Sequence, residues 1–337
     1  MSSEVRSRGA ELAALLEHFP SRRILVVGDM VADQFLYGEI SRVSREAPVL
    51  ILRHEQTETA PGGAANAAAN LAALGAQAIA IGVTGDDESG RALLERLRGF
   101  GVECRRIVTL PSRRTTTKVR ILAGHPHSTK QQVIRIDYEG VHSIDHETHE
   151  KLLSHIREEI GGVDAVIISD YDYGVAETPL VAAAWHASKE RGVPILIDSR
   201  FRLAEFKKFT SATPNEDEVE QLHGSTIKSD EELEAAGESL RKKLDYRSLL
   251  VTRGGRGMVL FEEGLEPLHI EAVGSREPVD VTGAGDTVIA VYSLAIASGA
   301  SFADAARIAN HAGGLVVMKR GTATISREEL LSSLGRW

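Results

Sequence analysis

Hydrophobic positions follow two alternating patterns along most of the chain. From Ile24 onward, short runs of β-branched residues alternate with longer segments in which apolar residues recur at helical spacing. This order is typical of a mostly parallel sheet with helices on both faces, so it predicts an α/β fold with an α/β/α sandwich. The core strands are expected at residues 24–27, 78–83, 165–169, 195–198, 249–252 and 258–261.

Two stretches, residues 35–58 and 104–138, interrupt this order. In residues 115–120 and 133–137, polar and apolar positions alternate as in strands with one exposed face. They predict a small antiparallel sheet beside the main one. The sequence Gly-His-Pro-His at residues 124–127 predicts a hairpin loop within it. A sheet of this kind is placed to close over a site as a lid.

The composition fits a self-folding globular protein. The chain has 337 residues, of which 42% are hydrophobic and 26% charged, values that are ordinary for such proteins. Its net charge of -9 argues against non-specific binding to nucleic acid or to an anionic membrane. Cys104 is the only cysteine, which excludes an intrachain disulfide and a cysteine-based zinc site. Because no repeat or linker divides the sequence, we expect one domain over residues 1–337 that carries the lid.

No segment of the sequence predicts a secretory signal or a membrane span. Charged residues such as Glu4, Arg6 and Glu11 occupy the positions where a secretory signal has its apolar core. Residues 59–85 are uncharged, but they contain many glycines and several amide side chains. We therefore expect a cytoplasmic protein whose N-terminal segment is an amphipathic helix.

The segment most informative about chemistry reads Asp-Val-Thr-Gly-Ala-Gly-Asp-Thr at residues 280–287, ahead of an uncharged helix. Gly283 and Gly285 leave backbone N–H groups open at a helix N-terminus, where unpaired donors and the helix dipole favour a phosphate or a developing negative charge. A carboxylate beside such an anion site suits phosphoryl transfer, with Asp286 as the base. An ordinary helix start with an aspartate cap explains the spacing equally well.

Two further segments place small or acidic residues where a ligand would bind. The glycine pair within residues 61–66 opens an alanine-rich helix on which Asn66 and Asn70 share one face. These amides suit sugar hydroxyls, although tight helix packing is the favoured explanation. Asp29 and Asp33 follow the first predicted strand, and open α/β sheets bind ligands at the carboxyl ends of their strands. Turn capping explains these two carboxylates equally well.

Taken together, these motifs resemble the PfkB, or ribokinase-like, family of sugar kinases over about residues 20–330. Residues 280–286 match the family's Asp-Thr-Gly-Ala-Gly-Asp signature with one added valine, and residues 62–66 match its N-terminal glycine signature. The resemblance implies a ribokinase-like fold, ATP as phosphoryl donor and Asp286 as catalytic base. It further implies an anion hole formed by the amides of Gly283, Ala284 and Gly285. The acceptor-sugar site that it implies consists of Asp29, Asp33, Gly62, Gly63 and Asn66.

The resemblance extends to the nucleotide side. Asn215 and Glu218 match the family's Asn-x-x-Glu element, which implies that Asn215 faces the ATP phosphates and that Glu218 acts on Mg²⁺ through water. The other ATP contacts that it implies are Thr252, Arg253, Gly254 and Gly257 near the triphosphate, and Asn310 and Gly313 beside the adenine. A buried asparagine on a helix is as often structural. The resemblance leaves a role for a monovalent cation open.

The lid carries a closer resemblance, to the family members that phosphorylate D-glycero-D-manno-heptose 7-phosphate at O1 in the synthesis of the lipopolysaccharide core. The matching features are Gly28-Asp29 with Asp33, Tyr37-Gly38, residues 41–44, 46–49 and 115–120, and residues 131–132 through 135–137. A phosphorylated acceptor needs cationic partners. The candidates on or near the lid are Lys118, Arg120 and Arg135, followed by Arg42 and Arg200.

Two segments depart from the pattern of these heptose kinases. The turn at residues 124–130 is longer, and Asp198-Ser199-Arg200 stands where they usually have Asp-Pro-Lys. We expect His125 and His127 in the long turn to be solvated rather than to bind a metal ion. No His-x-x-His element of a nucleotidyltransferase follows the kinase motifs, so kinase activity alone is expected.

Other functions remain open at this point. A different PfkB-type sugar kinase, such as a ribokinase, fructokinase or phosphofructokinase-like enzyme, would share all the ATP chemistry. A non-catalytic sugar-phosphate sensor is disfavoured because Asp286 and its glycines are present. A dinucleotide-binding enzyme is disfavoured because Gly28 does not begin a Gly-x-Gly-x-x-Gly turn. The partners implied by the resemblance are ATP, a sugar phosphate and a second copy of the chain paired through the lid.

Overall fold

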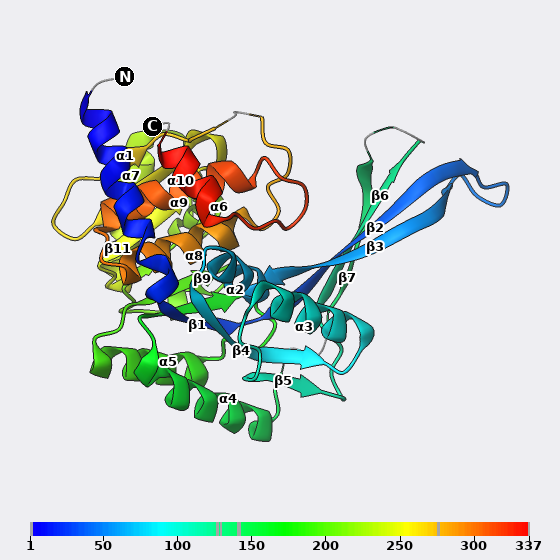
Figure 1. The fold of residues 1–337 in the computed structure, drawn as a ribbon, viewed down its shortest axis with the longest axis horizontal. Helices are drawn as coiled ribbons and strands as arrows, with labels where there is room; N and C mark the ends of the chain where they lie inside the picture. Colours follow the sequence, from blue (N-terminus) through cyan, green and yellow to red (C-terminus); the bar gives the residue numbers. More distant parts are fainter. Residues whose placement is uncertain (1–2, 126–127, 129, 140–142, 275–276, 336–337) are drawn as a thin grey trace.

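The computed structural model describes residues 3–125, 128, 130–139, 143–274 and 277–335, with side chains from residue 8 onward (Figure 1). His127 of the predicted hairpin loop lies outside these residues. None of the helices in the described part is long and apolar enough to cross a membrane.

The main sheet has nine strands, and every neighbouring pair is parallel except those that involve β12. All six core strands predicted from the sequence lie in it, so that prediction is confirmed. In spatial order the strands are β13 (Leu268–Ile270), β12 (Met258–Glu262), β11 (Ser248–Thr252), β10 (Ser211–Ala212), β9 (Ile195–Ser199), β8 (Ala165–Asp170), β1 (Arg23–Gly28), β4 (Gln77–Gly85) and β5 (Ile107–Leu110).

Helices cover both faces of this sheet, as the alternation along the sequence predicts. Side chains of β1 show why: Ile24 and Val26 belong to one buried cluster, and Leu25 and Val27 belong to the other. The helices that pack on the first cluster are α1 (Ser3–Leu16), α2 (Ala64–Ala73), α3 (Glu88–Phe100), α8 (Ala284–Ala297), α9 (Phe302–Val316) and α10 (Arg327–Leu334). Those on the second are α4 (His146–Glu159), α5 (Thr178–Arg191), α6 (Glu216–His223) and α7 (Asp230–Leu244).

A second sheet of four strands extends from one side of this sandwich (Figure 1). Its strands are, in spatial order, β3 (Leu50–Gly63), β2 (Met30–Val43), β6 (Thr117–Gly124) and β7 (Gln131–Tyr138). We call this sheet the lid. It differs from the expected antiparallel sheet in one pair, because β2 and β6 are parallel. The chain between them passes through β4 and β5 of the main sheet, and so long a connection permits a parallel pair.

The bounds of the lid also differ from those expected. Residues 107–110, assigned from the sequence to the lid, form β5 and pair with β4 at the edge of the main sheet. Conversely, β2 begins at Met30, directly after β1, and β3 runs on to Gly63, where α2 starts. The lid therefore includes Asp33 and Gly62.

Candidate active site

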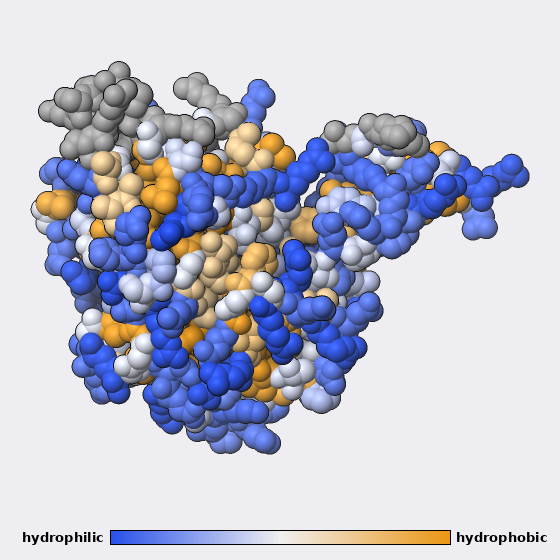
Figure 2. Space-filling model, viewed as in Figure 1, coloured by the Kyte–Doolittle hydropathy of each residue, from blue (hydrophilic) through white to orange (hydrophobic). Residues whose placement is uncertain are grey.

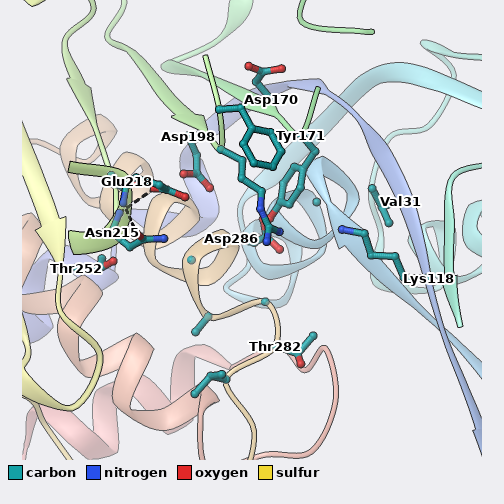
Figure 3. Close-up of a pocket in the computed structure, with 18 of the residues that line it drawn as sticks. Val31, Lys118, Asp170, Tyr171, Asp198, Asn215, Glu218, Thr252, Thr282 and Asp286 are labelled. Atoms are coloured by element: carbon teal, nitrogen blue, oxygen red, sulfur yellow. Dashed lines mark hydrogen bonds between the residues drawn. The ribbon is translucent and has the colours of Figure 1, made fainter. Parts of the chain in front are cut away.

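A cavity of about 600 Å³ lies where the carboxyl ends of the parallel strands meet the lid and the start of α8 (Figure 3). The lid contributes Val31, Asp33, Lys118, Arg120 and Arg135; the sheet edge contributes Asp170, Tyr171, Asp198, Arg200, Thr213 and Thr252; and the starts of α6 and α8 contribute Asn215, Glu218 and residues 283–286. Most of the residues expected at an active site thus surround one cavity.

The start of α8 presents backbone amides to the cavity. Gly283 precedes the helix with a φ of 76°, a conformation that favours glycine. A Cβ atom there would lie 2.5 Å from Asn66 Nδ2, so a side chain is also excluded by contact. Among the three expected amides, that of Ala284 donates to the Val281 carbonyl oxygen at 3.2 Å. The N–H groups of Gly285 and Asp286 belong to the first turn of α8, ahead of Thr287, whose N–H donates to the Gly283 carbonyl oxygen at 3.1 Å.

The Asp286 carboxylate is 2% exposed and receives a hydrogen bond on each oxygen. Asn66 Nδ2 donates to Oδ2 at 2.9 Å, and the Tyr171 hydroxyl donates to Oδ1 at 2.8 Å. Burial raises the pKa of Asp286 to about 6, while both hydrogen bonds act in the opposite direction. The carboxylate is therefore ionised at neutral pH, and it is a stronger base than an exposed aspartate.

Asn66 lies behind Asp286 rather than in the cavity wall. Its side chain is fully buried, and Asn70 Nδ2 donates to Asn66 Oδ1 at 3.0 Å. That bond directs the Asn66 amide nitrogen toward Asp286. The sequence predicts that Asn66 holds the acceptor sugar, but in the structure it holds the carboxylate, and its spacing of four from Asn70 serves this purpose.

Asp29 also differs from its expected position. It is 2% exposed, and its carboxylate accepts backbone N–H bonds from Tyr171, Tyr173 and Val175 at 2.8 to 3.1 Å. Burial raises its pKa to about 6 against the effect of these three donors. Asp29 therefore orders the loop after β8 from beneath instead of contacting a ligand in the cavity.

The glycine pair before α2 makes room for Asp33. A Cβ on Gly62 would lie 2.6 Å from Asp33 Oδ2, and Gly63 has a φ of 57°. Asp33 is 4% exposed, pairs with Arg120 and accepts a hydrogen bond of 3.1 Å from Thr322 Oγ1. Of the three residues, Asp33 and Gly63 line the cavity.

Lys118, Arg120 and Arg135 share the lid face that lines the cavity, because Lys118 and Arg120 are two apart on β6 and Arg120 pairs in register with Arg135. Arg135 forms a bidentate contact with Asp137 at 2.8 and 2.9 Å. Lys118 Nζ lies 5.2 Å from the centre of the Tyr171 ring. Burial lowers the pKa of Lys118.

The other two basic candidates, Arg200 and Arg42, lie in different parts of the structure. Arg200 lines the cavity beside Asp198. Arg42 lies on the exposed outer part of β2, away from the cavity, so the structure does not support it as a ligand contact.

On the opposite side of the cavity, Asn215 and Glu218 form a capping box at the start of α6 (Figure 3). Asn215 Oδ1 accepts the Glu218 N–H at 2.8 Å, and Glu218 Oε2 accepts the Asn215 N–H at 2.9 Å. Burial, followed by the Glu218 charge, holds the pKa of Asp198 well above its ordinary range, and burial raises that of Glu218.

The repulsion between these two carboxylates, which Arg200 offsets in part, fits a divalent cation near Glu218. No cluster of three or more His, Cys, Asp or Glu side chains suited to a metal ion occurs among the described residues. Magnesium commonly binds through one or two carboxylates, waters and substrate phosphates. The donor set around Glu218 therefore fits magnesium that arrives with a nucleotide, not a closed protein site.

The remaining expected nucleotide contacts divide into two groups. Thr252 lines the cavity, whereas Arg253 pairs with Asp230 at 2.7 Å and borders a separate cavity of about 740 Å³. Asn310 is 4% exposed and donates to the Glu271 carbonyl at 2.7 Å, a structural contact. Of the expected nucleotide contacts in this group, only Thr252 lies in the wall of the first cavity. The expected glycine contacts Gly254, Gly257 and Gly313 also lie outside that wall.

Comparison with known proteins decides the family. The model of the pfkB family of carbohydrate kinases matches residues 21–329. The chain belongs to the pfkB family. It is therefore a carbohydrate kinase, a phosphotransferase, and the resemblance of its two glycine signatures to that family is confirmed.

Curated relatives of this chain include the bifunctional protein HldE of Geobacter sulfurreducens, 39% identical over 323 residues, and that of Edwardsiella ictaluri, 42% identical over 323 residues. These alignments cover 96% and 95% of this chain, but the chain spans only 65% of the length of each relative.

Solved structures of sugar kinases show the same fold. Ribokinase from Arabidopsis thaliana with ribose and ATP superposes with a TM-score of 0.72 at 23% identity, over 93% of this chain and 98% of its own. Phosphofructokinase-2 from Escherichia coli with substrates and products gives 0.77 at 17% identity, over 94% and 99%. The expected ribokinase-like fold is confirmed.

Several cavity residues of this pfkB kinase were not predicted from the sequence as site residues, among them Asp170, Tyr171 and Asp198. Asp170, Tyr171 and Asp198 follow or end β8 and β9, two parallel strands whose carboxyl ends face the cavity. The rule that ligands bind at those ends was applied to Asp29 and Asp33 alone. The same rule covers the ends of the strands predicted at 165–169 and 195–198, so it points to Asp170, to Asp198 and to the loop that begins at Tyr171.

Proposed function

We propose that this chain transfers the γ-phosphoryl group of ATP to O1 of D-glycero-D-manno-heptose 7-phosphate, which yields the 1,7-bisphosphate. The observation that carries the proposal is the buried Asp286 carboxylate, which lies beside the first-turn amides of α8 and faces a cavity lined by lid cations. The resemblance of the lid segments to heptose kinases and the similarity to HldE proteins support this acceptor.

In the proposed reaction, the O1 hydroxyl attacks the γ-phosphorus and the bond to the β–γ bridging oxygen breaks, which releases ADP. The hydroxyl proton passes to Asp286. Because the transition state is loose, the hydroxyl keeps its proton until late, so Asp286 chiefly orients it. The N–H groups of Gly285 and Asp286 stabilise charge on the transferred group. No covalent enzyme intermediate is formed.

On the nucleotide side, Asn215 and Thr252 are proposed to face the ATP phosphates, and Glu218 would hold magnesium through water. Magnesium, when bound, neutralises charge that develops on the phosphate oxygens. Asn310 and Gly313 are proposed to act indirectly, by shaping the α9 surface near Glu271 against which the adenine would lie.

On the acceptor side, the 7-phosphate is proposed to bind Lys118, Arg120, Arg135 and Arg200. Two of these cations already have carboxylate partners, Asp33 for Arg120 and Asp137 for Arg135. A phosphate placed among them would share these cations with the carboxylates. Charge-assisted bonds of this kind are stronger than neutral ones, which favours a phosphorylated acceptor.

The direct test is ATP turnover with a panel of heptose 7-phosphate, fructose 6-phosphate, ribose and fructose, with the phosphate position of the product assigned by NMR. We expect heptose 7-phosphate to give the highest kcat/KM and phosphate on O1. If ribose or fructose matched it, the heptose assignment would be abandoned and the pfkB kinase assignment kept. Asp286→Asn protein supplies the background rate.

We also propose that two copies of the chain pair through the lid. Register places Leu36, Ile121 and Ile134 in one row across the sheet, with Val119 and Ile136 in the next, on the face opposite the cavity. Ile134 is 53% exposed and Ile136 is 39% exposed. Figure 2 shows hydrophobic residues among hydrophilic ones along the protruding lid. A second lid would cover this apolar face.

Light scattering after size exclusion tests the pairing. The unmodified chain is expected to be a dimer and Ile134→Asp a monomer. Leu265→Asp, which changes a residue that is 63% exposed outside the lid, should remain a dimer. A monomeric unmodified chain, or a dimeric Ile134→Asp variant at the same concentration, would contradict the proposal.

A further inference from the structure

Tyr171 connects the loop after β8 to the proposed base. Its backbone N–H donates to Asp29 Oδ2 at 2.8 Å, which fixes the start of the loop. Its ring lines the cavity, with Lys118 Nζ 5.2 Å from the ring centre. Its hydroxyl donates to Asp286 Oδ1 at 2.8 Å (Figure 3). Tyr171 is therefore held at its backbone while its hydroxyl reaches the carboxylate.

We infer that Tyr171 is a positioning residue for phosphoryl transfer, whose hydroxyl keeps Asp286 ionised and holds its Oδ1 toward the acceptor hydroxyl. The inference rests on the proposed function, in which Asp286 is the base. A carboxylate has about four acceptor positions on its two oxygens. Oδ1 can therefore accept bonds from Tyr171 and from the acceptor together, while Asn66 holds Oδ2.

The phenol is suited to this role because it acts only as a donor to Asp286. Burial, followed by the Asp286 charge, holds the pKa of Tyr171 well above its ordinary value, so the hydroxyl stays protonated through the working pH range. A protonated donor stabilises the ionised carboxylate and not the neutral acid. Loss of the hydroxyl would thus favour protonation of Asp286.

Other charged groups around Asp286 also affect its pKa. Asp33 on β2 raises the pKa of Asp286, and Lys118 on β6 lowers it. Asp198 at the end of β9 interacts unfavourably with the same carboxylate. None of these groups is changed when the Tyr171 hydroxyl alone is removed, so a shift in that variant reports the hydrogen bond.

The test is the pH dependence of kcat for Tyr171→Phe. We expect its acid limb to move to higher pH by about one to two units, the size of a lost hydrogen bond to a charged group. Relative to the unmodified enzyme, activity should then fall about five- to twenty-five-fold more at pH 6 than at pH 8. The phosphate groups of both substrates titrate identically in every variant, so the comparison removes their contribution.

Tyr173→Phe is the matched control. Tyr173 belongs to the same loop, its backbone N–H also binds Asp29, and Lys118 Nζ lies 5.6 Å from its ring centre. Its hydroxyl, however, donates to Glu139 at 3.1 Å. The acid limb of this variant should match that of the unmodified enzyme. An equal shift in both variants would mean that the loop, and not the bond to Asp286, is responsible.

A second substitution gives the opposite sign and does not remove the hydroxyl. 3-Fluorotyrosine at position 171 has a more acidic phenol and is a stronger donor, so the acid limb should move to lower pH. If Tyr171→Phe fails to fold, the acid limb of the fluorotyrosine variant tests the inference by itself. An unmoved limb in either variant overturns the inference. Substantial activity in Asp286→Asn would instead overturn the proposed base, so the two failures are distinguishable.

Discussion

Asn66 and Asp286 lie 220 positions apart in the chain, yet Asn66 Nδ2 donates to Asp286 Oδ2 at 2.9 Å. The same nitrogen also lies 3.2 Å from the Gly283 carbonyl oxygen. The start of α2 is thereby joined to the start of α8. The two glycine-containing motifs of the sequence form a single structural unit in which one motif holds the reactive carboxylate of the other.

Replacing Asp286 with asparagine should nearly abolish turnover. The change preserves shape but removes the proton acceptor, so we expect kcat to fall by about a hundredfold or more. ATP affinity should stay within a few fold, because the nucleotide side is unchanged. Steady-state kinetics and a nucleotide-binding titration check this. Retention of more than a tenth of the activity would reject the assigned role.

The same substitution should change stability in a pH-dependent way. The pKa of Asp286 in the folded protein, about 6, is above its ordinary value of 3.8. Folding therefore becomes more favourable as the pH falls through 6, and this gain is lost again as the pH rises through 6. Between pH 7.5 and 4.5 the unmodified chain should gain about 2 kcal/mol relative to Asp286→Asn. Urea unfolding at both pH values measures the difference, which would be constant if the carboxylate were not perturbed.

Lys118→Met should weaken binding of the sugar phosphate selectively. Loss of a charged hydrogen bond corresponds to roughly a 10- to 150-fold increase in KM for the acceptor, with little change in KM for ATP. Arg42→Met serves as control, since Arg42 is an exposed lid cation outside the cavity. Equal weakening for both substrates would assign Lys118 to the nucleotide or to folding. An unchanged KM would show that it does not touch the acceptor.

Gly283→Ala and Gly285→Ala form a pair that tests the geometry of the α8 start. At 283, a φ of 76° and a Cβ 2.5 Å from Asn66 Nδ2 should destabilise the fold by about 2 kcal/mol or more. At 285, an added Cβ would have no atom within 4 Å apart from its chain neighbours and the backbone of its own helix, so the free energy of unfolding should hardly change. Denaturant unfolding of both variants checks the contrast. Comparable losses would mean that the helix start is not shaped as described.

The alternation of apolar runs was sufficient to predict the strands of the main sheet, because buried parallel strands have a strong local signal. It could not predict that residues 107–110 join that sheet or that β2 and β6 run parallel. Both depend on how distant segments meet, which periodicity does not record. The N-terminal helix and the lid hairpin, which are local, were predicted correctly.

For the site, the sequence identified which residues belong together but not where each side chain points. Asp33, Lys118, Asn215 and Asp286 line the cavity as expected. Asn66 and Asp29 instead face inward and support other groups. The strand-end rule points to the loop that carries Tyr171, but nothing in the local sequence distinguishes a tyrosine that reaches a carboxylate from one that packs in the core.

The cavity is unbroken from Lys118 on the lid to Thr252 on the main sheet. A single synthetic compound could therefore occupy both halves, with a phosphate toward the lid and a nucleoside toward β11. Joining the two parts turns the second contact into an intramolecular one, so affinity should rise well beyond that of either part when the linker matches the span. Selectivity over other carbohydrate kinases would then come from the lid end, where the cations of this chain are arranged.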